Sequence, residues 1–509
     1  MTDQPTATQA TAKRFLSRRD EIQSWFDART WSLSGDTSTY PTQDTDVPDD
    51  ECKAEQQAGG HCRAKTVLFP TSTDDISAIL GDLPPGTPVS IVCGGHSPSN
   101  ASTAACVGAV VLDLHKLDKV SVDKDLMQVT VGGGVLTRQL AEAVRDAGGA
   151  LPVGTGDTVG VAGYVTNGGI SGYFQKRLGM MGQRAIKMTV VLADGTVRDL
   201  TKGTSGSEED QELFRAMLGA GSALGVLTSL TLQMERDAIF RTGGNLVVAC
   251  GTLEAAQTYA RRALTFLRDV VLPNPSVSME LVVTADFTCI VTLVFYDTFE
   301  GDPAEFAQDL REAGGDTVVV DDVAGWTTWF ASSLWPVIAE MKGDPLIRMD
   351  HCMGTRITSA RPDDAVLDFV VDDWIGRMPF ELASQSIVEI RSLGGEAASQ
   401  GNADLVPAGN AKCEFFADMI VAYDGKDKSS DERRQIQSKV DAIIGDAKKL
   451  GGDDSSAVYV DFSATHSQPG GCGGSDVFGS DANYETIRSV KRKVDPLSRL
   501  RCHPFGTLL

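Results

Sequence analysis

Four clusters of glycine in the first half of this 509-residue chain constrain its fold more than any other feature. They lie at 94–95, 132–134, 154–172 and 219–225. Glycine allows tight turns and close approach of the backbone to a ligand, and it lets N–H groups turn toward an anion. Any single cluster is compatible with ordinary turns. Four clusters in one region favour loops that hold a ligand, and a diphosphate would suit them.

Two familiar phosphate-binding patterns are absent from the sequence. A P-loop requires GxxxxGK[ST], which does not occur. A Rossmann fingerprint requires GxGxxG between a first strand and a helix. The stretch "GTGDTVG" at 154–160 has one residue too many before its last glycine, and no clean βαβ unit surrounds it. A nicotinamide-dependent dehydrogenase is therefore disfavoured.

Composition and charge indicate a soluble globular chain of more than one domain. Hydrophobic residues make up 42% and charged residues 23% of the chain, and the net charge is −23. Because such a surface repels phosphates, we expect neither nucleic acid nor an anionic membrane as a partner. No apolar run approaches a membrane span, and the start "MTDQPTATQATAKRFLSRRDE" has no apolar signal core. We therefore expect a cytoplasmic protein.

The ten cysteines show no metal-binding pattern. No CxxC occurs and no Cys/His group has zinc spacing, so we expect no metal. Reduced thiols are the simplest interpretation. Cys52 and Cys62 flank a short polar loop and could pair in an oxidising compartment.

Strand and helix patterns divide the chain into regions. Up to about residue 235, short strands alternate with glycine turns and helices, including a hairpin with an Asp194-Gly195 turn. From 236 to 455, longer strands such as "SVSMELVVTAD", "CIVTLVFYD" and "CEFFADMIVAY" predict one antiparallel sheet with helices on one side. The tail returns to glycine loops. The fold class is α+β, with an extension at 1–62, a first domain at 63–235, a second at 236–455 and a returning segment at 456–509.

Several motifs, and the order in which they occur along the chain, resemble those of the FAD-linked oxidases of the vanillyl-alcohol oxidase superfamily, in particular the berberine-bridge-enzyme-like branch. The matching stretches are "GGHS" at 94–97, "VVLDLHKL", "TVGVAGYVTNGGISGYFQKRLGM", "VVLADGTV", "LFRAMLGAGSALGVLT", "LGGE" at 393–396, "YVDF" at 459–462 and "VKRKVDP" at 490–496. The resemblance implies a PCMH-type FAD-binding domain built from both ends of the chain. A substrate domain is inserted between them.

The resemblance also implies which residues bind the flavin. His96 occupies the position that forms a covalent bond to the flavin in this family. A histidine can form such a bond because a neutral imidazole is nucleophilic. A core histidine held by hydrogen bonds is the alternative. The other implied cofactor contacts are Gly94, Gly95, Ser97, Gly156, Thr158, Val159, Gly160, Gly163, Asn167, Gly168, Gly169, Gly172, Gly225, Val226 and Asp461.

Some positions depart from the family pattern. Many relatives form a second flavin bond through a cysteine where this chain has Gly156, so the resemblance implies a single bond. Val92 stands where an arginine or lysine is common, and Asp461 stands where an asparagine is common. Val159 is the small residue that goes with oxygen access in the related branch.

Removal of a hydride from a C–H bond also requires a base for the hydroxyl or amine proton. Tyr459 holds the tail position of a catalytic tyrosine in the resembling family. Glu414 and Asp418 alternate onto one face of a predicted strand, where they either face solvent or line the site. Glu389 and Arg391 form a similar pair on another strand, and His351 is a further candidate.

Together these features predict an oxidase that carries one covalent FAD. We expect it to oxidise an alcohol, a sugar hydroxyl or an amine carbon and to pass the electrons to O2, giving H2O2. A dehydrogenase with another acceptor and an inactive flavin-binding protein are the alternatives. The expected partners are a small-molecule substrate and O2, and the chain is expected to be a monomer or a homodimer.

Overall fold

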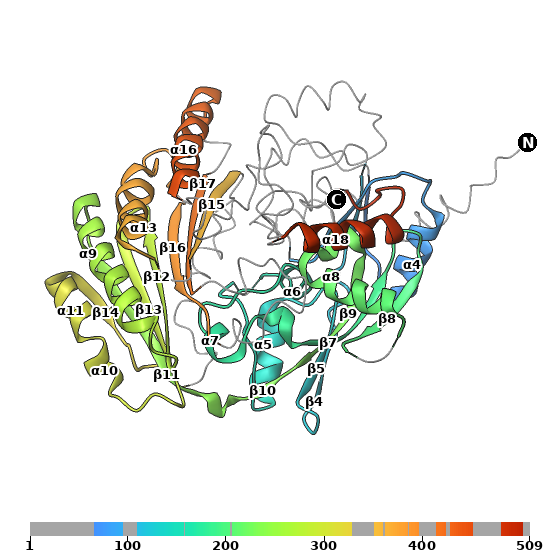
Figure 1. Ribbon diagram of the computed structural model, residues 1–509, viewed down its shortest axis with the longest axis horizontal. Coiled ribbons are helices and arrows are strands. Elements are labelled where there is room, and N and C mark those ends of the chain that lie inside the picture. The colour runs from blue at the N-terminus through green and yellow to red at the C-terminus, as the bar shows by residue number, and fades with distance from the viewer. Residues whose placement is uncertain are drawn as a thin grey trace, which may run out of the picture.

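The computed structural model describes most of the chain in two halves that lie side by side (Figure 1). The described residues are 66–94, 109–156, 158–203, 206–327, 351–359, 362–384, 386–395, 414–423, 428–450 and 480–501. One half contains two small sheets and their helices, and the other contains one large sheet. This is the predicted α+β class. Within the described ranges, no helix is both long enough and apolar enough to cross a bilayer.

The first half is built on a parallel and an antiparallel sheet. The parallel sheet has the order β1-β3-β2, and the antiparallel sheet has the order β4-β5-β9-β7-β8. Their strands are β1 (Thr66–Leu68), β2 (Val89–Val92), β3 (Val110–Asp113), β4 (Val120–Asp123), β5 (Gln128–Gly132), β7 (Ala185–Val191), β8 (Val197–Thr201) and β9 (Val226–Gln233). β6 (Gly149–Ala150) pairs with β10 (Glu235–Arg236). The predicted Asp194-Gly195 hairpin is confirmed as β7–β8, with Gly195 at φ +89°.

Helices of this half begin where the sequence supplies caps. The helices are α4 (Thr73–Asp82), α5 (Thr137–Asp146), α6 (Val161–Thr166), α7 (Gln175–Leu178), η2 (Met181–Arg184), α8 (Glu208–Leu224) and α18 (Asp481–Val494). Ser72 caps α4 and Ser207 caps α8 through their hydroxyl oxygens. Within the fourth glycine cluster α8 is kinked at Ala220, whose backbone angles are not helical, and it ends before Gly225.

The second half is a seven-stranded antiparallel sheet of order β14-β11-β13-β12-β16-β17-β15. The strands are β11 (Phe240–Ala249), β12 (Val277–Thr284), β13 (Thr288–Tyr296), β14 (Val318–Asp321), β15 (His351–Ser359), β16 (Ile387–Ser392) and β17 (Phe415–Tyr423). All of its strand pairs are antiparallel, as the sequence predicted. The sequence analysis did not predict β15, which forms one edge.

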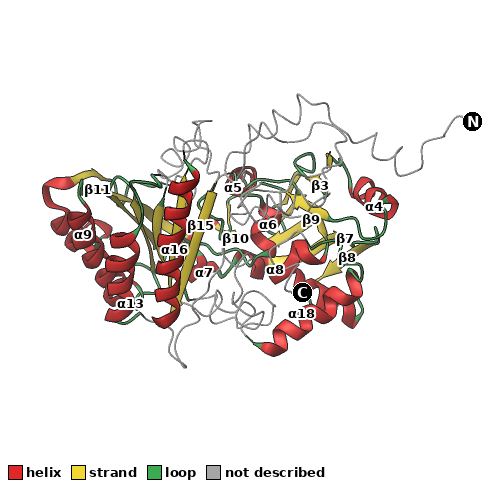
Figure 2. Cartoon of the chain, turned by 90° about the horizontal axis from the view of Figure 1, so that it is seen from above, coloured by secondary structure: helices red, strands yellow, loops and turns green. Residues whose placement is uncertain are grey.

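Helices cover one face of this large sheet (Figure 2). They are α9 (Leu253–Phe266), η4 (Leu267–Val271), α10 (Pro303–Phe306), α11 (Gln308–Gly314), η5 (Gly315–Thr317), α13 (Asp364–Asp368), η6 (Phe369–Ile375) and α16 (Ser430–Leu450); η3 (Asp237–Ile239) precedes β11. Met279, Leu281 and Val283 of β12 point into the core beneath these helices. Because side chains alternate along a strand, the intervening residues face the first half.

The described part of the tail, residues 480–501, packs on the first half. α18 lies along α8 in Figure 1, and its Lys491 Nζ donates to the carbonyl of Ala223 and to Asp495 Oδ2, at 2.6 and 2.7 Å. The Arg499 guanidinium donates to the carbonyls of Leu80 and Ala193. The predicted domain boundaries themselves remain predictions.

Candidate functional site

Two glycine loops of the first half touch each other through bare backbone. A Cβ added at Gly94 would lie 2.3 Å from Gly160 N and 2.5 Å from Thr158 O. A Cβ at Gly160 would lie 2.4 Å from Cys93 Sγ. The carbonyl of Val159 accepts from Thr137 N and Oγ1, which holds the second loop against α5. Only glycine fits at these contacts, so the loop at the end of β2 and the loop before α6 form one unit.

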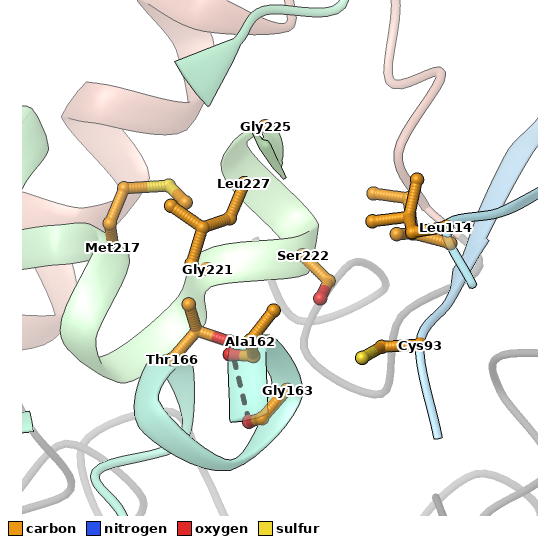
Figure 3. Close-up of a pocket in the computed structure, with 11 residues that line it drawn as sticks. Cys93, Leu114, Ala162, Gly163, Thr166, Met217, Gly221, Ser222, Gly225 and Leu227 are labelled. Carbon is orange, nitrogen blue, oxygen red and sulfur yellow. Dashed lines mark hydrogen bonds between the residues drawn. The ribbon is translucent and has the colours of Figure 1, made fainter. Parts of the chain in front are cut away.

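A pocket opens beside these loops, between α6, α8 and the end of β2 (Figure 3). Its cavity volume is about 40 Å³, which is room for a few water molecules, and the pocket is partly open to solvent. Gly163, Thr166, Ser222 and Cys93 line it. A Cβ at Gly163 would meet nothing within 4 Å, whereas one at Gly221 would lie 2.3 Å from Thr166 Cβ. Gly221 therefore lets α6 and α8 approach closely beneath the pocket.

Several other residues predicted to bind the flavin surround the same loops. Gly156 O accepts from Val159 N, Gly225 ends α8 at the pocket, and Val226 begins β9. Asn167 is exposed, and its Nδ2 donates to the carbonyl of Gly163 at 2.7 Å. Further residues have specific placements: Gly168 and Gly169 adopt positive φ, Gly172 lies at the contact between the two halves, and Val92 is buried.

Five predicted residues lie outside the described part of the chain. They are Gly95, His96, Ser97, Tyr459 and Asp461. His351 is described only as backbone, at the start of β15.

A polar row crosses the face of the large sheet that is turned toward the first half. Strand register places Asn245, Thr292, Glu280 and Arg391 side by side on β11, β13, β12 and β16. Thr292 Oγ1 donates to Asn245 Oδ1 at 2.9 Å, and Arg391 Nε donates to Glu280 Oε1 at 2.6 Å. This face therefore carries charge where the opposite face carries only core side chains.

Two more carboxylates lie in the next row of the same face. Glu389 of β16 is directly opposite Asp418 of β17. Arg391 also donates to Glu389 through Nη2. Glu280, Glu389 and Asp418 are only 1%, 9% and 5% exposed. We call Glu280, Glu389, Arg391 and Asp418 the acid cluster.

The carboxyl groups of Glu280 and Glu389 have pKa values shifted in opposite directions. Burial opposes ionisation of Glu280, but the adjacent Arg391 lowers its pKa below the ordinary value. Burial raises the pKa of Glu389 well above its usual range, and the charges of Glu280 and Asp418 add to this effect. Burial opposes the charge of Arg391, yet Glu389 and Glu280 together raise its pKa. A proton in the cluster is therefore held more readily by Glu389 than by Glu280, which is paired with Arg391.

The first half meets the acid cluster through the end of the third glycine cluster. A Cβ at Gly172 would lie 2.9 Å from Arg391 Cδ. Tyr173 is buried, and burial and Glu280 raise the pKa of its hydroxyl. Tyr296 Oη of β13 donates to the carbonyl of Tyr173 at 2.7 Å. The glycine-rich segment therefore connects the loop region to the polar face of the sheet.

Lys176, from the same segment, anchors in the second half. Its Nζ donates to the carbonyls of Val271, Asn274 and Val277 at 2.6, 3.1 and 3.1 Å. Burial lowers the pKa of Lys176 to about 7, against the raising effect of Glu414. The buried amine of Lys176, bound to three carbonyls, ties the first half to the second.

The two predicted strand acids have different surroundings. Asp418 is buried in the acid cluster. Glu414 precedes β17 and is exposed, so the expectation that the two lie together on one strand face is wrong for Glu414. Its carbonyl accepts from Leu393 N at 2.6 Å.

The sequence analysis did not single out Glu280, Tyr173 or Lys176. A lone acid in the apolar strand "SVSMELVV" was the available signal for Glu280. No comparable local signal marks Tyr173 or Lys176.

Comparisons with known proteins agree with this geometry. Residues 64–201 match the "FAD binding domain" family. (R)-6-hydroxynicotine oxidase of Paenarthrobacter nicotinovorans is 31% identical over 149 residues, which are 29% of this chain and 31% of that protein. Berberine bridge enzyme-like C-1 of Nicotiana tabacum is 31% identical over 160 residues, which are 30% of this chain and 27% of that protein. These matches span about a third of the length of the curated relatives.

The structural likeness extends over nearly the whole chain. The crystal structure of 6-hydroxy-D-nicotine oxidase from Arthrobacter nicotinovorans has a TM-score of 0.66 and 20% identity, and the match covers 93% of this chain and 97% of that one. Fold and loop region together define a two-domain flavoprotein with an FAD-binding domain. Residues 64–201 therefore match an FAD-binding domain, and the proteins that this chain resembles in sequence and in fold include berberine-bridge-enzyme-like proteins.

Proposed function

We propose that this protein is an FAD-dependent oxidase that acts on an alcohol, a sugar hydroxyl or an amine carbon. The acid cluster carries this proposal. Three buried carboxylates and a partly buried arginine lie on a sheet face that is turned toward an FAD-binding domain. Burying charge in this way is costly, and it is characteristic of sites that move protons.

The residues of the first half fit the cofactor. The touching loops of Gly94 and Gly160 would contact the dinucleotide, and the open space at Gly163 and the small pocket beside α8 would border it. Bound FAD would supply the hydride acceptor and would pass the electrons to O2 to give H2O2. We propose a single covalent attachment, through His96. Val159, a small residue between the two loops, supports access of oxygen.

The acid cluster would accept the proton that the substrate loses. Asp418 would accept the proton of the substrate hydroxyl or amine, with the protonated Glu389 as its neighbour. Arg391 would hold Glu389 in place through its Nη2 hydrogen bond. Its positive charge would also balance the negative charge of Glu280. Tyr459 remains a proposed partner in this step. Gly172 and Tyr173 close the site against the first half, which would exclude water.

The first test follows the flavin. The purified protein is precipitated with acid, and the His96 peptide is examined for the mass of FAD. Flavin in the pellet on that peptide supports the covalent link, whereas flavin in the supernatant refutes it. A preparation that takes up no FAD would refute the proposed function.

The second test follows turnover. Substrates of the three classes are mixed anaerobically with the protein, and bleaching of the flavin is recorded. Air is then admitted and H2O2 is measured. Stoichiometric peroxide supports an oxidase. Bleaching that is reversed only by an artificial acceptor identifies a dehydrogenase, and the absence of bleaching with every class favours an inactive binding protein.

A further inference from the structure

Two cysteines of the second half lie close together at one end of the large sheet. Cys250 follows β11 and Cys289 belongs to β13, and both are free thiols. Their sulfurs are 3.9 Å apart, within hydrogen-bonding distance. Residue 248 of β11 is directly opposite Cys289. The two thiols are therefore neighbours on adjacent strands although 39 positions separate them in the chain.

The backbone around Cys250 allows the sulfurs to approach further. Cys250 N donates to the carbonyl of Val248, which turns the chain back toward β13 as the strand ends. Gly251 follows with φ +70° and with open space around it. A disulfide has an S–S distance of about 2 Å, so the sulfurs must close a gap of about 2 Å. A strand end followed by an unrestrained glycine can make this movement.

The two thiols differ in exposure. Cys289 is fully buried, and its sulfur also lies 4.0 Å from the carbonyl of Ala256 in α9. Cys250 is half-buried at the edge of the same core and is open to a small oxidant. The hydrogen bond with Cys289 lowers the pKa of Cys250 and makes its thiolate more available. The same neighbour raises the pKa of Cys289, followed by the effects of burial and of Asp286.

We propose that Cys250 and Cys289 form a peroxide-reactive dithiol that closes an intramolecular disulfide. The Cys250 thiolate attacks one oxygen of a hydroperoxide and the O–O bond breaks. Cys250 becomes a sulfenic acid, and with H2O2 the departing oxygen takes a proton and leaves as water. The Cys289 sulfur then attacks the Cys250 sulfur, the S–O bond breaks, and a second water leaves with the Cys289 proton. Two thiols are oxidised and one peroxide is reduced.

The assignment of roles follows from the same geometry. Cys250 is the peroxidatic thiol because it is the accessible one of the pair. Cys289 is the resolving thiol because it is buried against Cys250 and shielded from solvent. Once Cys250 is a neutral sulfenic acid, the largest cause of the raised Cys289 pKa is gone. Cys289 lies on the helix-covered face of the sheet, and the acid cluster lies on the opposite face. The disulfide would therefore form away from the acid cluster.

The test uses the full chain and added H2O2, so it does not depend on the proposed oxidase activity. The reduced protein is treated with a few equivalents of H2O2 and quenched with catalase. Free thiols are alkylated in denaturant, and the protein is digested without reductant. We expect the peptides of Cys250 and Cys289 to be joined, with the loss of two hydrogens. Both sites should escape alkylation, and dithiothreitol should restore it. Catalase added before the peroxide should prevent the link.

Two variants separate the roles of the thiols. In Cys289→Ala, peroxide should leave a sulfenic acid on Cys250 that dimedone traps. In Cys250→Ala, Cys289 should remain alkylatable after unfolding. The proposal is overturned if both wild-type thiols are fully alkylated after peroxide, or if Cys250 is linked to another cysteine instead. The wild-type measurement decides the question even if a variant does not fold.

Discussion

At the scale of single residues, Asp418 illustrates how position determines chemistry. It lies opposite Glu389 and contributes to the raised pKa of that carboxyl. Replacement by asparagine keeps the size of the side chain and removes the proton acceptor. We expect Asp418→Asn to slow anaerobic flavin reduction by roughly 10²- to 10⁴-fold while FAD remains bound. The measurement is stopped-flow absorbance.

A matched control for Asp418 is Asp309→Asn, because Asp309 is exposed on α11. This variant should reduce its flavin at the wild-type rate. Equal rates for Asp418→Asn and the wild type would show that Asp418 is not the proton acceptor.

Lys176 predicts a pH dependence of stability. Its pKa in the folded protein is about 7, below the ordinary value of 10.5, because burial disfavours the charge. Between these two values the unfolded chain holds a proton that the folded chain lacks. Stability should therefore rise with pH through this window, by at most about 1.4 kcal/mol per pH unit. Lys176→Met should lack this contribution.

The comparison for Lys176 is the urea midpoint at pH 7, 8 and 9. The difference in urea midpoint between the wild type and Lys176→Met should grow with pH. The same difference for Lys124→Met should stay constant, because Lys124 is exposed. A constant difference for Lys176→Met would mean that the lysine keeps its charge throughout.

At the scale of secondary-structure elements, the packing of α6 against α8 depends on one glycine. A Cβ at Gly221 would lie 2.3 Å from Thr166 Cβ and 2.6 Å from its Cγ2. Alanine is the better helix former by about 1 kcal/mol, but overpacking costs about 1–3 kcal/mol. We expect Gly221→Ala to lower the thermal midpoint and to weaken FAD binding, because Gly221 also lines the pocket. Calorimetry and flavin titration measure both effects.

Gly81 of α4 provides the opposite case on a helix of the same half. The nearest heavy atom to its added Cβ is 4.0 Å away. Gly81→Ala should therefore be neutral or should raise the thermal midpoint. A similar response of both variants would show that helix propensity, and not the Thr166 contact, decides the outcome.

At the scale of the whole molecule, Tyr296 joins the two halves. Its hydroxyl interacts with Ser278 Oγ at 2.5 Å and donates to the carbonyl of Tyr173 at 2.7 Å. Tyr296→Phe leaves that buried carbonyl without its donor, at a cost of about 1–3 kcal/mol. We expect Tyr296→Phe to have a lower unfolding midpoint. If the Tyr296–Tyr173 contact makes the two halves unfold together, they should unfold separately in this variant. Calorimetry distinguishes one transition from two.

Tyr259 is the matched control for Tyr296. Its hydroxyl is buried and, among the described residues, has no hydrogen-bond partner. Tyr259→Phe should leave the unfolding midpoint unchanged or raise it slightly. A loss equal to that of Tyr296→Phe would assign the effect to packing and not to the contact between the halves.

The sequence by itself determined the local elements of this protein. Serine caps began helices α4 and α8, the Asp194-Gly195 turn closed a hairpin, and period-2 alternation marked most strands of the large sheet. These signals depend on neighbours within a few residues, so they can be identified without knowledge of the fold. The order of motifs also predicted the FAD-binding domain that residues 64–201 match, and the α+β class of the fold.

Only the tertiary structure decided which of these residues meet. Glu280 and Arg391 are 111 positions apart, and pairing of β12 with β16 brings them together. Asp418 is buried and Glu414 is exposed although both were predicted on one strand face, because β17 begins only at Phe415. The glycines around Ala220 coincide with a kink in α8, and the close contact of Gly221 with Thr166 of α6 becomes visible only in the folded chain. In each case the free energy that decides the outcome comes from contacts distant in sequence, which no local pattern records.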